Sequence, residues 1–411
     1  MHDGAAILLD LFVIFVAAQL GAVLAQRIKL PGVVGEIVAG ALIGPSVLGL
    51  LDPATILPGT PLDVLAEIGV VLLLFSVGLE TRLDDLKKVG RSAFLVGVAG
   101  VVVPFAIGSL WAHGEGFDWA KSLFIAAAFV ATSAGITARV LQELGVLSRI
   151  ESRVILGAAV IDDILAMLLL GVVTSLQAGG SIQVGHLLLV LVEAIAFIAV
   201  IGWVGTRVMR RRAYWLDRPI NPLSPLTIAL AICLGLAFLA TGFGLAAIIG
   251  AFLAGMIASE LHQRDELEHQ MQPLLALLTP FFFVITGAKI DLGVFTSGTA
   301  LWMLLVVTVI AVATKFAGGF IGALALGPRG ATIVGVGMIP RGEVGIVIAS
   351  LGLAAHVFSN EVYAVIVAMS LLTSVVTPPV LAWLLRQPPV DTAKPPRPVD
   401  SGNAPMEDPA P

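Results

Sequence analysis

Residues 153–176 read RVILGAAVIDDILAMLLLGVVTSL, an apolar run interrupted by two adjacent carboxylates, Asp162 and Asp163. About twenty apolar residues is the length that an α-helix needs to cross the hydrocarbon core of a bilayer. Both aspartates lie near the middle of the run, where a charged side chain is costly and marks an ion or proton pathway. The stretch therefore predicts a membrane-spanning helix with a functional site at its centre.

The composition of the chain extends this prediction to many spanning helices. Of its 411 residues, 58% are hydrophobic and only 12% are charged, whereas soluble domains carry about 25% charged residues. The apolar runs do not alternate in hydrophobicity as the strands of a membrane β-barrel would. We therefore expect an all-α polytopic membrane protein with about thirteen transmembrane helices. The apolar runs fall at residues 5–26, 31–50, 63–80, 92–111, 121–143, 153–177, 186–208, 225–241, 243–260, 273–288, 299–325, 330–356 and 361–385.

The loops between these runs predict an orientation. When the N-terminus is placed outside and the spans alternate, nearly all lysines and arginines of the loops fall on the cytoplasmic side, which agrees with the positive-inside rule. The C-terminus is then cytoplasmic. Residues 387–411 are rich in proline, and we expect a disordered tail that is too short for a nucleotide-binding regulatory domain. No basic cluster has the interleaved aromatic residues that would indicate nucleic-acid binding.

Charged side chains elsewhere in the apolar runs extend the candidate site. Two adjacent carboxylates do not both ionise cheaply, so one of the aspartates is expected to exchange a proton for a cation. Lys315 is the only charge in its run, and it can pair with one aspartate, release a proton itself, or do both. Arg341 and Glu343 are expected to form a supporting ion network with Glu67 or Glu36, with gating or pH sensing as the alternative role.

Two runs contain residues that interrupt a helix. FVATSAGITARV, residues 129–140, places Thr132 and Ser133 ahead of a glycine, and GVGMIPRGEVGIVIAS, residues 335–350, places Pro340 among glycines. These runs lie seven apart, and an odd offset gives them opposite orientations, as in the inverted repeats of secondary transporters. We therefore expect two discontinuous helices that cross, with hydroxyl groups available to an ion.

Motifs from the second run to the twelfth carry a family resemblance. They are LPGVVGEIVAGALIGPSVLGLL (30–51), LLLFSVGLETRL (72–83), VATSAGITARVLQELGVLSR (130–149), ILGAAVIDDI (155–164), GAFLAGM (250–256) and GMIPRGEVGIVIA (337–349). The chain resembles the monovalent cation:proton antiporter-2 family, and within it the bacterial NapA-type sodium/proton antiporters. The resemblance implies a homodimer in which a mobile core domain works against a dimer domain.

The same resemblance implies roles for individual residues. Asp163 matches the essential ion carrier, and Asp162 matches the partner of a lysine at Lys315, so Na+ would bind at Asp163 and Asp162. The unwound crossing segments match Thr132 and Ser133 and the region around Pro340. The transmembrane antiporter domain would span residues 1–386, with core elements at about 92–177 and 299–385, dimer elements at about 5–80 and 225–288, and a linker helix at about 186–208.

We therefore expect an antiporter, not an enzyme, that exchanges Na+ for protons across a bacterial inner membrane without a cofactor. Li+ is a further candidate cation, and transport is expected to be electrogenic through an elevator-like core movement. Related potassium/proton systems usually carry Gln-Asp at the position of Asp162 and Asp163, so the Asp-Asp pair favours sodium. Two alternatives stay open: a potassium/proton antiporter on the same scaffold, and a sodium-coupled solute symporter.

Overall fold

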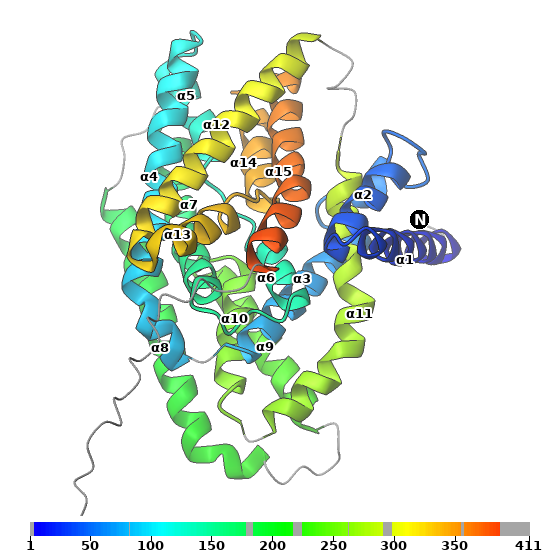
Figure 1. The fold of residues 1–411 in the computed structure, drawn as a ribbon, viewed down its shortest axis with the longest axis vertical. Coiled ribbons are helices and arrows are strands. Elements are labelled where there is room, and N and C mark those ends of the chain that lie inside the picture. Colours follow the sequence, from blue (N-terminus) through cyan, green and yellow to red (C-terminus); the bar gives the residue numbers. More distant parts are fainter. Residues whose placement is uncertain are drawn as a thin grey trace, which may run out of the picture.

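The computed structural model describes residues 4–81, 83–177, 184–216, 224–261, 263–290, 298–354 and 357–386. Within these ranges every regular element is a helix (Figure 1). Nine helices of this described part are long and apolar enough to cross a membrane, and the predicted tail at 387–411 lies outside it. The helices are α1 (Gly4–Arg27), α2 (Gly32–Ile43), η1 (Pro53–Ile56), α3 (Pro61–Leu79), α4 (Leu83–Gly114), α5 (Trp119–Ala128), α6 (Ala134–Glu143), α7 (Ile150–Gln177), α8 (Val184–Leu216), α9 (Ser224–Gly242), α10 (Ala247–Ala258), α11 (Arg264–Ala288), α12 (Gly298–Gly322), η3 (Leu324–Leu326), α13 (Gly327–Gly337), α14 (Glu343–Ala354) and α15 (Asn360–Arg386).

Each predicted apolar run coincides with one helix or with one interrupted pair of helices. The run at 121–143 contains α5 and α6, and the run at 330–356 contains α13 and α14. Local signals explain several helix starts: α3 follows Thr60, whose hydroxyl accepts from a first-turn N–H, and α5 follows Asp118, which does the same. Such capping satisfies backbone donors that a helix start leaves without partners. The all-α fold class is confirmed, and the number of membrane crossings stays a prediction.

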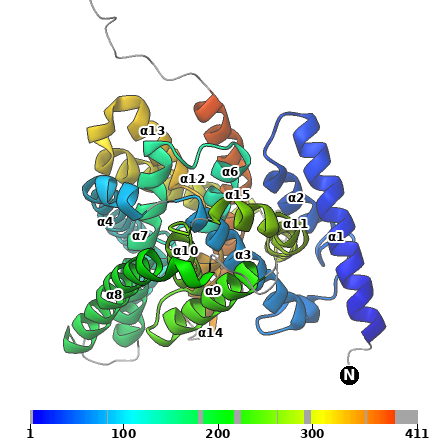
Figure 2. The same ribbon diagram turned by 90° about the horizontal axis from the view of Figure 1, so that it is seen from below.

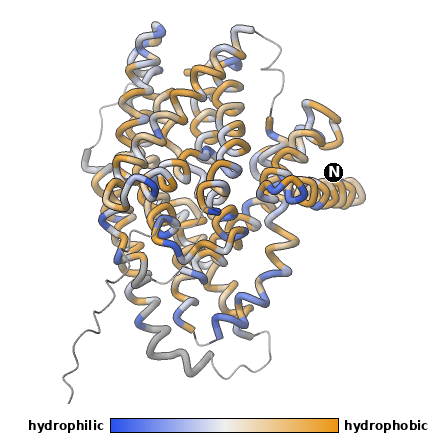
Figure 3. Tube along the Cα trace, viewed as in Figure 1, coloured by the Kyte–Doolittle hydropathy of each residue, from blue (hydrophilic) through white to orange (hydrophobic). Residues whose placement is uncertain are grey.

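The helices pack in two groups, which we name the core group and the panel group. In the core group, α4, α5, α7 and α12 to α15 pack on one another, and in the panel group α1 to α3 pack with α9 to α11. Helix α8 contacts α7 on one side and α9 and α10 on the other. Helix α6 contacts α7 and α15 as well as α2 and α3, so it lies between the groups (Figure 2). Apolar residues cover most of the helix lengths in both groups (Figure 3).

Glycine contacts repeat between the two halves of the chain. A Cβ on Gly40 of α2 would lie 2.0 Å from the carbonyl oxygen of Val284 in α11, and a Cβ on Gly255 of α10 would lie 2.0 Å from that of Phe75 in α3. These glycines end the matching stretches GEIVAG and GAFLAG. Small residues of this kind let helix backbones approach closely in membrane proteins. The pairs α2–α11 and α10–α3 are therefore equivalent, as an inverted repeat displaced by seven runs requires.

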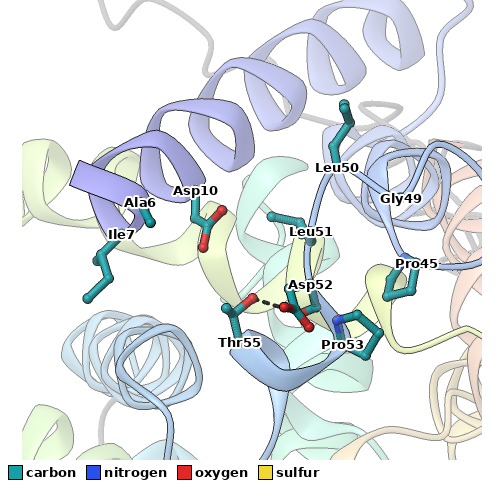
Figure 4. Close-up of a pocket in the computed structure, with 10 residues that line it drawn as sticks. All are labelled: Ala6, Ile7, Asp10, Pro45, Gly49, Leu50, Leu51, Asp52, Pro53 and Thr55. Carbon is teal, nitrogen blue, oxygen red and sulfur yellow. Dashed lines mark hydrogen bonds between the residues drawn. The ribbon is translucent and has the colours of Figure 1, made fainter. Parts of the chain in front are cut away.

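A cavity of about 590 Å³ opens between α1 and the loop that follows α2 (Figure 4). Its carboxylates are those of Asp10 and Asp52, and Asp52 caps η1 by accepting from the N–H of Ala54 at 2.8 Å. All of its lining residues come from α1, this loop or η1. The cavity therefore belongs to the panel group and does not contain the aspartates of α7.

Candidate functional site

Two interrupted helices meet at their breaks. The chain leaves the helical conformation at 129–133, between α5 and α6, and again at 338–342, between α13 and α14. The N–H of Ser133 donates to the carbonyl oxygen of Pro340 at 2.8 Å, so a backbone hydrogen bond joins the two breaks. Helix ends carry unpaired backbone groups and partial charges. The breaks therefore bring four helix ends together, and these ends need polar partners.

Lys315, on α12, is one polar partner of the groups at these helix ends. Its side chain is fully buried, and Nζ donates to Asp162 Oδ1 at 2.6 Å and to the carbonyl oxygens of Val130 and Gly100 at 2.5 and 2.9 Å. All three donors of the ammonium group are thus used. The Val130 carbonyl lies in the first break, two residues after the end of α5, so Lys315 compensates both the Asp162 carboxylate and the negative end of a helix.

Arg341 anchors the second break to the first. Its side chain is fully buried, and its guanidinium donates to the carbonyl oxygens of Ala131 in the first break and Ala311 in α12, at 3.2 and 3.1 Å. Two residues of α15 bind the backbone of Arg341: the Thr373 hydroxyl accepts from the Arg341 N–H at 3.2 Å, and the Ser374 hydroxyl donates to the Arg341 carbonyl. A single side chain therefore connects both breaks with α12, while the backbone beside it is fixed by α15.

Asp162 and Asp163 point in different directions from α7. Asp162 is fully buried against Lys315, whereas Asp163 is 3% exposed and lines a small cavity of about 10 Å³ with residues of α3, α6 and α10. Leu74 and Phe252 of the panel group are among its neighbours in this cavity. Adjacent residues on a helix project about 100° apart, which explains the separation. Asp163 therefore lies at the boundary between the core and panel groups.

Some buried oxygens at the crossing have no hydrogen-bond partner within the described residues. These are Thr132 Oγ1 in the first break and Asp162 Oδ2 on α7. Buried polar atoms are normally hydrogen-bonded, and hydroxyl, carbonyl and carboxylate oxygens suit hard cations. The hydroxyl of Ser133 lies close to Gly342, where a Cβ would come within 2.5 Å of it. The crossing thus contains candidate oxygen ligands and brings the two breaks into close contact.

The structure places the expected supporting network differently from the prediction. Glu36 is buried on α2, with Oε1 4.0 Å from a guanidinium nitrogen of Arg139, and Glu67 is exposed on α3. Among the described contacts, neither carboxylate bonds to Arg341, whose partners are backbone carbonyls and hydroxyl groups. Grouping the charges by run, and not by helix face, did not separate these positions in the sequence. Glu343 begins α14, and its side chain lies outside the part that the structure describes.

Hydroxyl groups on α15 form part of the site that the sequence did not single out. Ser370, Thr373 and Ser374 are buried, and both Thr373 and Ser374 donate to the Ser370 carbonyl at 2.8 Å. Polar residues at positions i, i+3 and i+4 of an apolar run share one helix face, and this spacing was the available signal. The carbonyls that bind Lys315 and Arg341 carry no signal in the sequence, because every residue has one.

A buried lysine–aspartate pair beside two crossing helix breaks, in an all-helical membrane protein with repeated helix contacts, defines the class: an ion-coupled secondary transporter. The family described as sodium/hydrogen exchanger, transmembrane, matches residues 12–387. The chain therefore belongs to the sodium/hydrogen exchanger family. It is a transporter and not an enzyme.

Individual relatives agree with this membership. The chain is 34% identical to the Na(+)/H(+)-K(+) antiporter GerN of Bacillus cereus, covering 90% of this chain and 94% of that protein. It is 35% identical to the high-affinity Na(+)/H(+) antiporter NhaS3 of Synechocystis, covering 92% and 89%. The sodium proton antiporter MjNhaP1 of Methanocaldococcus jannaschii is similar in structure, with a TM-score of 0.69 and 17% identity over 94% of this chain and 96% of that chain. The structural likeness shows the shared fold.

Proposed function

We propose that the chain exchanges sodium, and also lithium, for protons across a bacterial inner membrane, and that the exchange is electrogenic. The observation that carries this proposal is the position of Asp163, a buried carboxylate at the boundary between the two helix groups, beside the Asp162–Lys315 ion pair. A carboxylate in such a place can hold a proton or a cation in turn. The sequence relatives whose names include Na(+)/H(+) antiport support the same choice of ions.

In the proposed cycle, Asp163 is the carrier. Sodium displaces the proton of Asp163, and the unpartnered oxygens of Thr132 and Asp162 help to complete an oxygen shell. As Asp162 turns toward sodium, the Lys315 ammonium loses its carboxylate partner and a second proton leaves the site. About two protons then cross for each sodium ion, so net charge moves and the membrane potential drives sodium out of the cell.

The proposed movement displaces the core elements, at about 92–177 and 299–385, against the dimer elements, at about 5–80 and 225–288. The packing of the helices in two groups supports this division, and the linker predicted at 186–208 falls in α8, which contacts both groups. An elevator-like displacement of the core group would carry Asp163 along the boundary on which it lies. Each side of the membrane would then gain access to it alternately.

We also propose a homodimer with an outside N-terminus and a cytoplasmic C-terminus. Helix α1 supports the dimer because it presents exposed apolar side chains, including Phe12 at 64% and Leu20 at 60% exposure, to lipid or to a second copy. Within the family, the adjacent pair Asp162 and Asp163 favours the NapA type of the cation:proton antiporter-2 group. The distribution of loop lysines and arginines supports the orientation.

Proteoliposomes containing the purified protein test the function. A sodium gradient should drive proton flux, read with a pH-sensitive dye, and an imposed membrane potential should change its rate. Asp163→Asn keeps the shape of the side chain but removes its exchangeable proton, so the sodium-driven flux should fall to background. Asp118→Asn, an exposed helix cap, serves as the control and should keep the flux. Normal flux in Asp163→Asn would overturn the assignment of the carrier.

Potassium/proton antiport is the second candidate, because the relative GerN is named as an antiporter of potassium as well as sodium. The site itself consists of oxygen ligands that both cations accept. The same proteoliposomes, tested with sodium, lithium and potassium at equal concentration, decide between them. Sodium and lithium should drive proton flux at concentrations at which potassium does not. The sodium-coupled symporter is not favoured, since the chain belongs to an exchanger family.

A further inference from the structure

The end of α6 is attached to two helices of the panel group. Gln142 Nε2 donates to Ser76 Oγ at 3.0 Å and to Glu80 Oε1 at 3.1 Å, which lie at the end of α3. All three side chains are at least partly buried. Hydrogen bonds with a charged partner stabilise more than neutral ones when they are shielded from water. The contact therefore holds α6 against α3 at this end of the molecule.

Glu143 connects the same end of α6 to the start of α2. Its Oε2 accepts from the N–H of Gly32, the first residue of α2, at 2.9 Å, and its Oε1 pairs with Arg139 Nε at 2.9 Å. The side chain of Arg139 extends further to Glu36, with 4.0 Å between charged atoms. A carboxylate at a helix N-terminus satisfies a donor that has no intrahelical partner and interacts favourably with the helix dipole. One residue of α6 thus caps a helix of the panel group.

A third contact lies at the same end of the molecule. Arg386, the last residue of α15, donates to the carbonyl oxygen of Lys29 in the turn between α1 and α2, at 2.9 Å. The view from below shows α6 and α15 beside α2 (Figure 2). In the proposed orientation, this is the cytoplasmic end. Ala134, at the opposite end of α6, lines the cavity of Asp163, so Gln142 and Glu143 lie about 12–14 Å from it along the helix.

We propose that these contacts form a cytoplasmic latch, made by Gln142 and Glu143 of α6 with α3 and α2, which must open in each transport cycle before Asp163 can exchange ions with the cytoplasm. The latch rests on the proposed function, because it assumes that α6, which lies within the proposed core elements at about 92–177, moves with the core group against the panel group. Gln142 and Glu143 are positioning residues in this cycle. They do not bind the ion, and they set how often the cytoplasmic route is closed.

A static structural contact would have different consequences from a latch. Weakening a static contact lowers the stability of the protein but does not change how easily the Asp163 cavity is reached from the cytoplasmic face. The bonds of a latch exist only in the closed state. Removing them therefore destabilises the closed state alone and shifts the population toward the state that is open to the cytoplasm. The readout must therefore compare accessibility from the cytoplasmic face, and not activity alone.

Cysteine labelling measures this accessibility without any transport. Val160 lines the Asp163 cavity, and Val160→Cys in a Cys233→Ala background leaves a single thiol, since the chain has one cysteine. In everted vesicles, a membrane-impermeant thiol reagent should label this cysteine about tenfold faster when Glu143→Gln or Gln142→Ala is added, the effect expected from one charge-assisted hydrogen bond. Unchanged labelling rates in both variants would overturn the latch.

Lys289→Gln is the matched control for labelling. Lys289 forms an ion pair with Asp63 at 3.0 Å, and this pair joins α3 and the end of α11 inside the panel group. The Lys289→Gln change breaks a polar contact comparable to that of Glu143, but this contact lies within the panel group and does not cross the boundary between the groups. The labelling rate should therefore stay at that of the parent protein. A tenfold increase in this control would show that any lost ion pair opens the cavity, and would also overturn the proposal.

A cross-link tests whether the latch must open. Ser76→Cys and Gln142→Cys in the Cys233→Ala background place two thiols across the boundary at the hydrogen bond described above, and a short bismaleimide can join them. Cross-linked protein should lose the sodium-driven proton flux that the same double variant shows before the reagent is added, while each single variant should show equal flux before and after treatment. Full flux in cross-linked protein would overturn the latch. A parent protein without sodium-driven flux would instead contradict the proposed function, and the labelling result would stand separately.

Discussion

At the scale of single residues, the two adjacent aspartates differ because α7 presents them to different surroundings. Asp162 faces Lys315 and is fully buried, whereas Asp163 lines the cavity at the boundary between the groups. The approximately 100° turn between neighbours on a helix is sufficient to separate them. The dipeptide therefore combines one member of a buried ion pair and the carboxylate that we propose as the carrier in one turn of helix.

The Lys315–Asp162 pair should behave as a coupled unit in stability measurements. Lys315→Gln leaves a buried carboxylate without its cation, and Asp162→Asn leaves a buried ammonium with carbonyl partners alone. Removing one partner of a buried pair costs about 3–5 kcal/mol. Each single variant should therefore unfold at a lower temperature in detergent than the parent protein. The double variant should recover part of the loss, because it contains no uncompensated charge.

An exposed pair provides the control for this measurement. Lys121 and Asp118 lie 3.9 Å apart, and their side chains are 43% and 58% exposed. Exposed pairs contribute about 0–1 kcal/mol, so Lys121→Gln should leave the unfolding temperature nearly unchanged. A Lys315→Gln/Asp162→Asn double variant whose loss of stability equals the sum of the two single losses would show that the two residues are not coupled.

At the scale of elements, the interruptions of two helices organise the site. Thr132 and Ser133 identify the first break in the sequence, and Pro340 with its flanking glycines identifies the second, because a proline removes a backbone donor and glycine weakens a helix. The structure places the breaks at 129–133 and 338–342. The side chain of Arg341 then joins them through the Ala131 carbonyl. Helix ends that would be costly in a membrane are thereby satisfied.

The glycine contacts predict equal effects in the two halves of the chain. Gly40→Ala and Gly255→Ala each place a methyl group 2.0 Å from a backbone carbonyl oxygen of a neighbouring helix, so the helices must separate. Both variants should lower the unfolding temperature in detergent by similar amounts, equivalent to about 1–3 kcal/mol. Gly235→Ala is the control, because a Cβ there meets open space and alanine favours a helix over glycine by about 1 kcal/mol.

A large difference between the two glycine variants would contradict their equivalence. If Gly40→Ala unfolded early and Gly255→Ala matched the parent protein, the two contacts would not be related by an inverted repeat. Gly235→Ala should be as stable as the parent or slightly more stable. A loss in this control would point to a general intolerance of alanine in these helices.

At the scale of the whole molecule, the apolar runs were sufficient to predict the all-α class and the approximate positions of the long helices, because spanning a bilayer demands long apolar segments. The pairing of Lys315 with Asp162 could also be anticipated, since a buried charge needs a partner. The partners of Glu36 and Arg341 could not, because they depend on which helix faces meet in space. The repeat of GEIVAG in GAFLAG was readable in the sequence, and its meaning became clear only from the helix contacts.

The central claim is that sodium and protons compete for Asp163, and proton release on sodium binding measures it most directly. Purified protein in weakly buffered detergent solution, with a pH indicator, should release about two protons per bound sodium ion, because a carboxylate must lose its proton to bind a metal ion. Lys315→Gln should release about one, and Asp163→Asn should release none. Release from Asp163→Asn equal to that of the parent protein would contradict the claim.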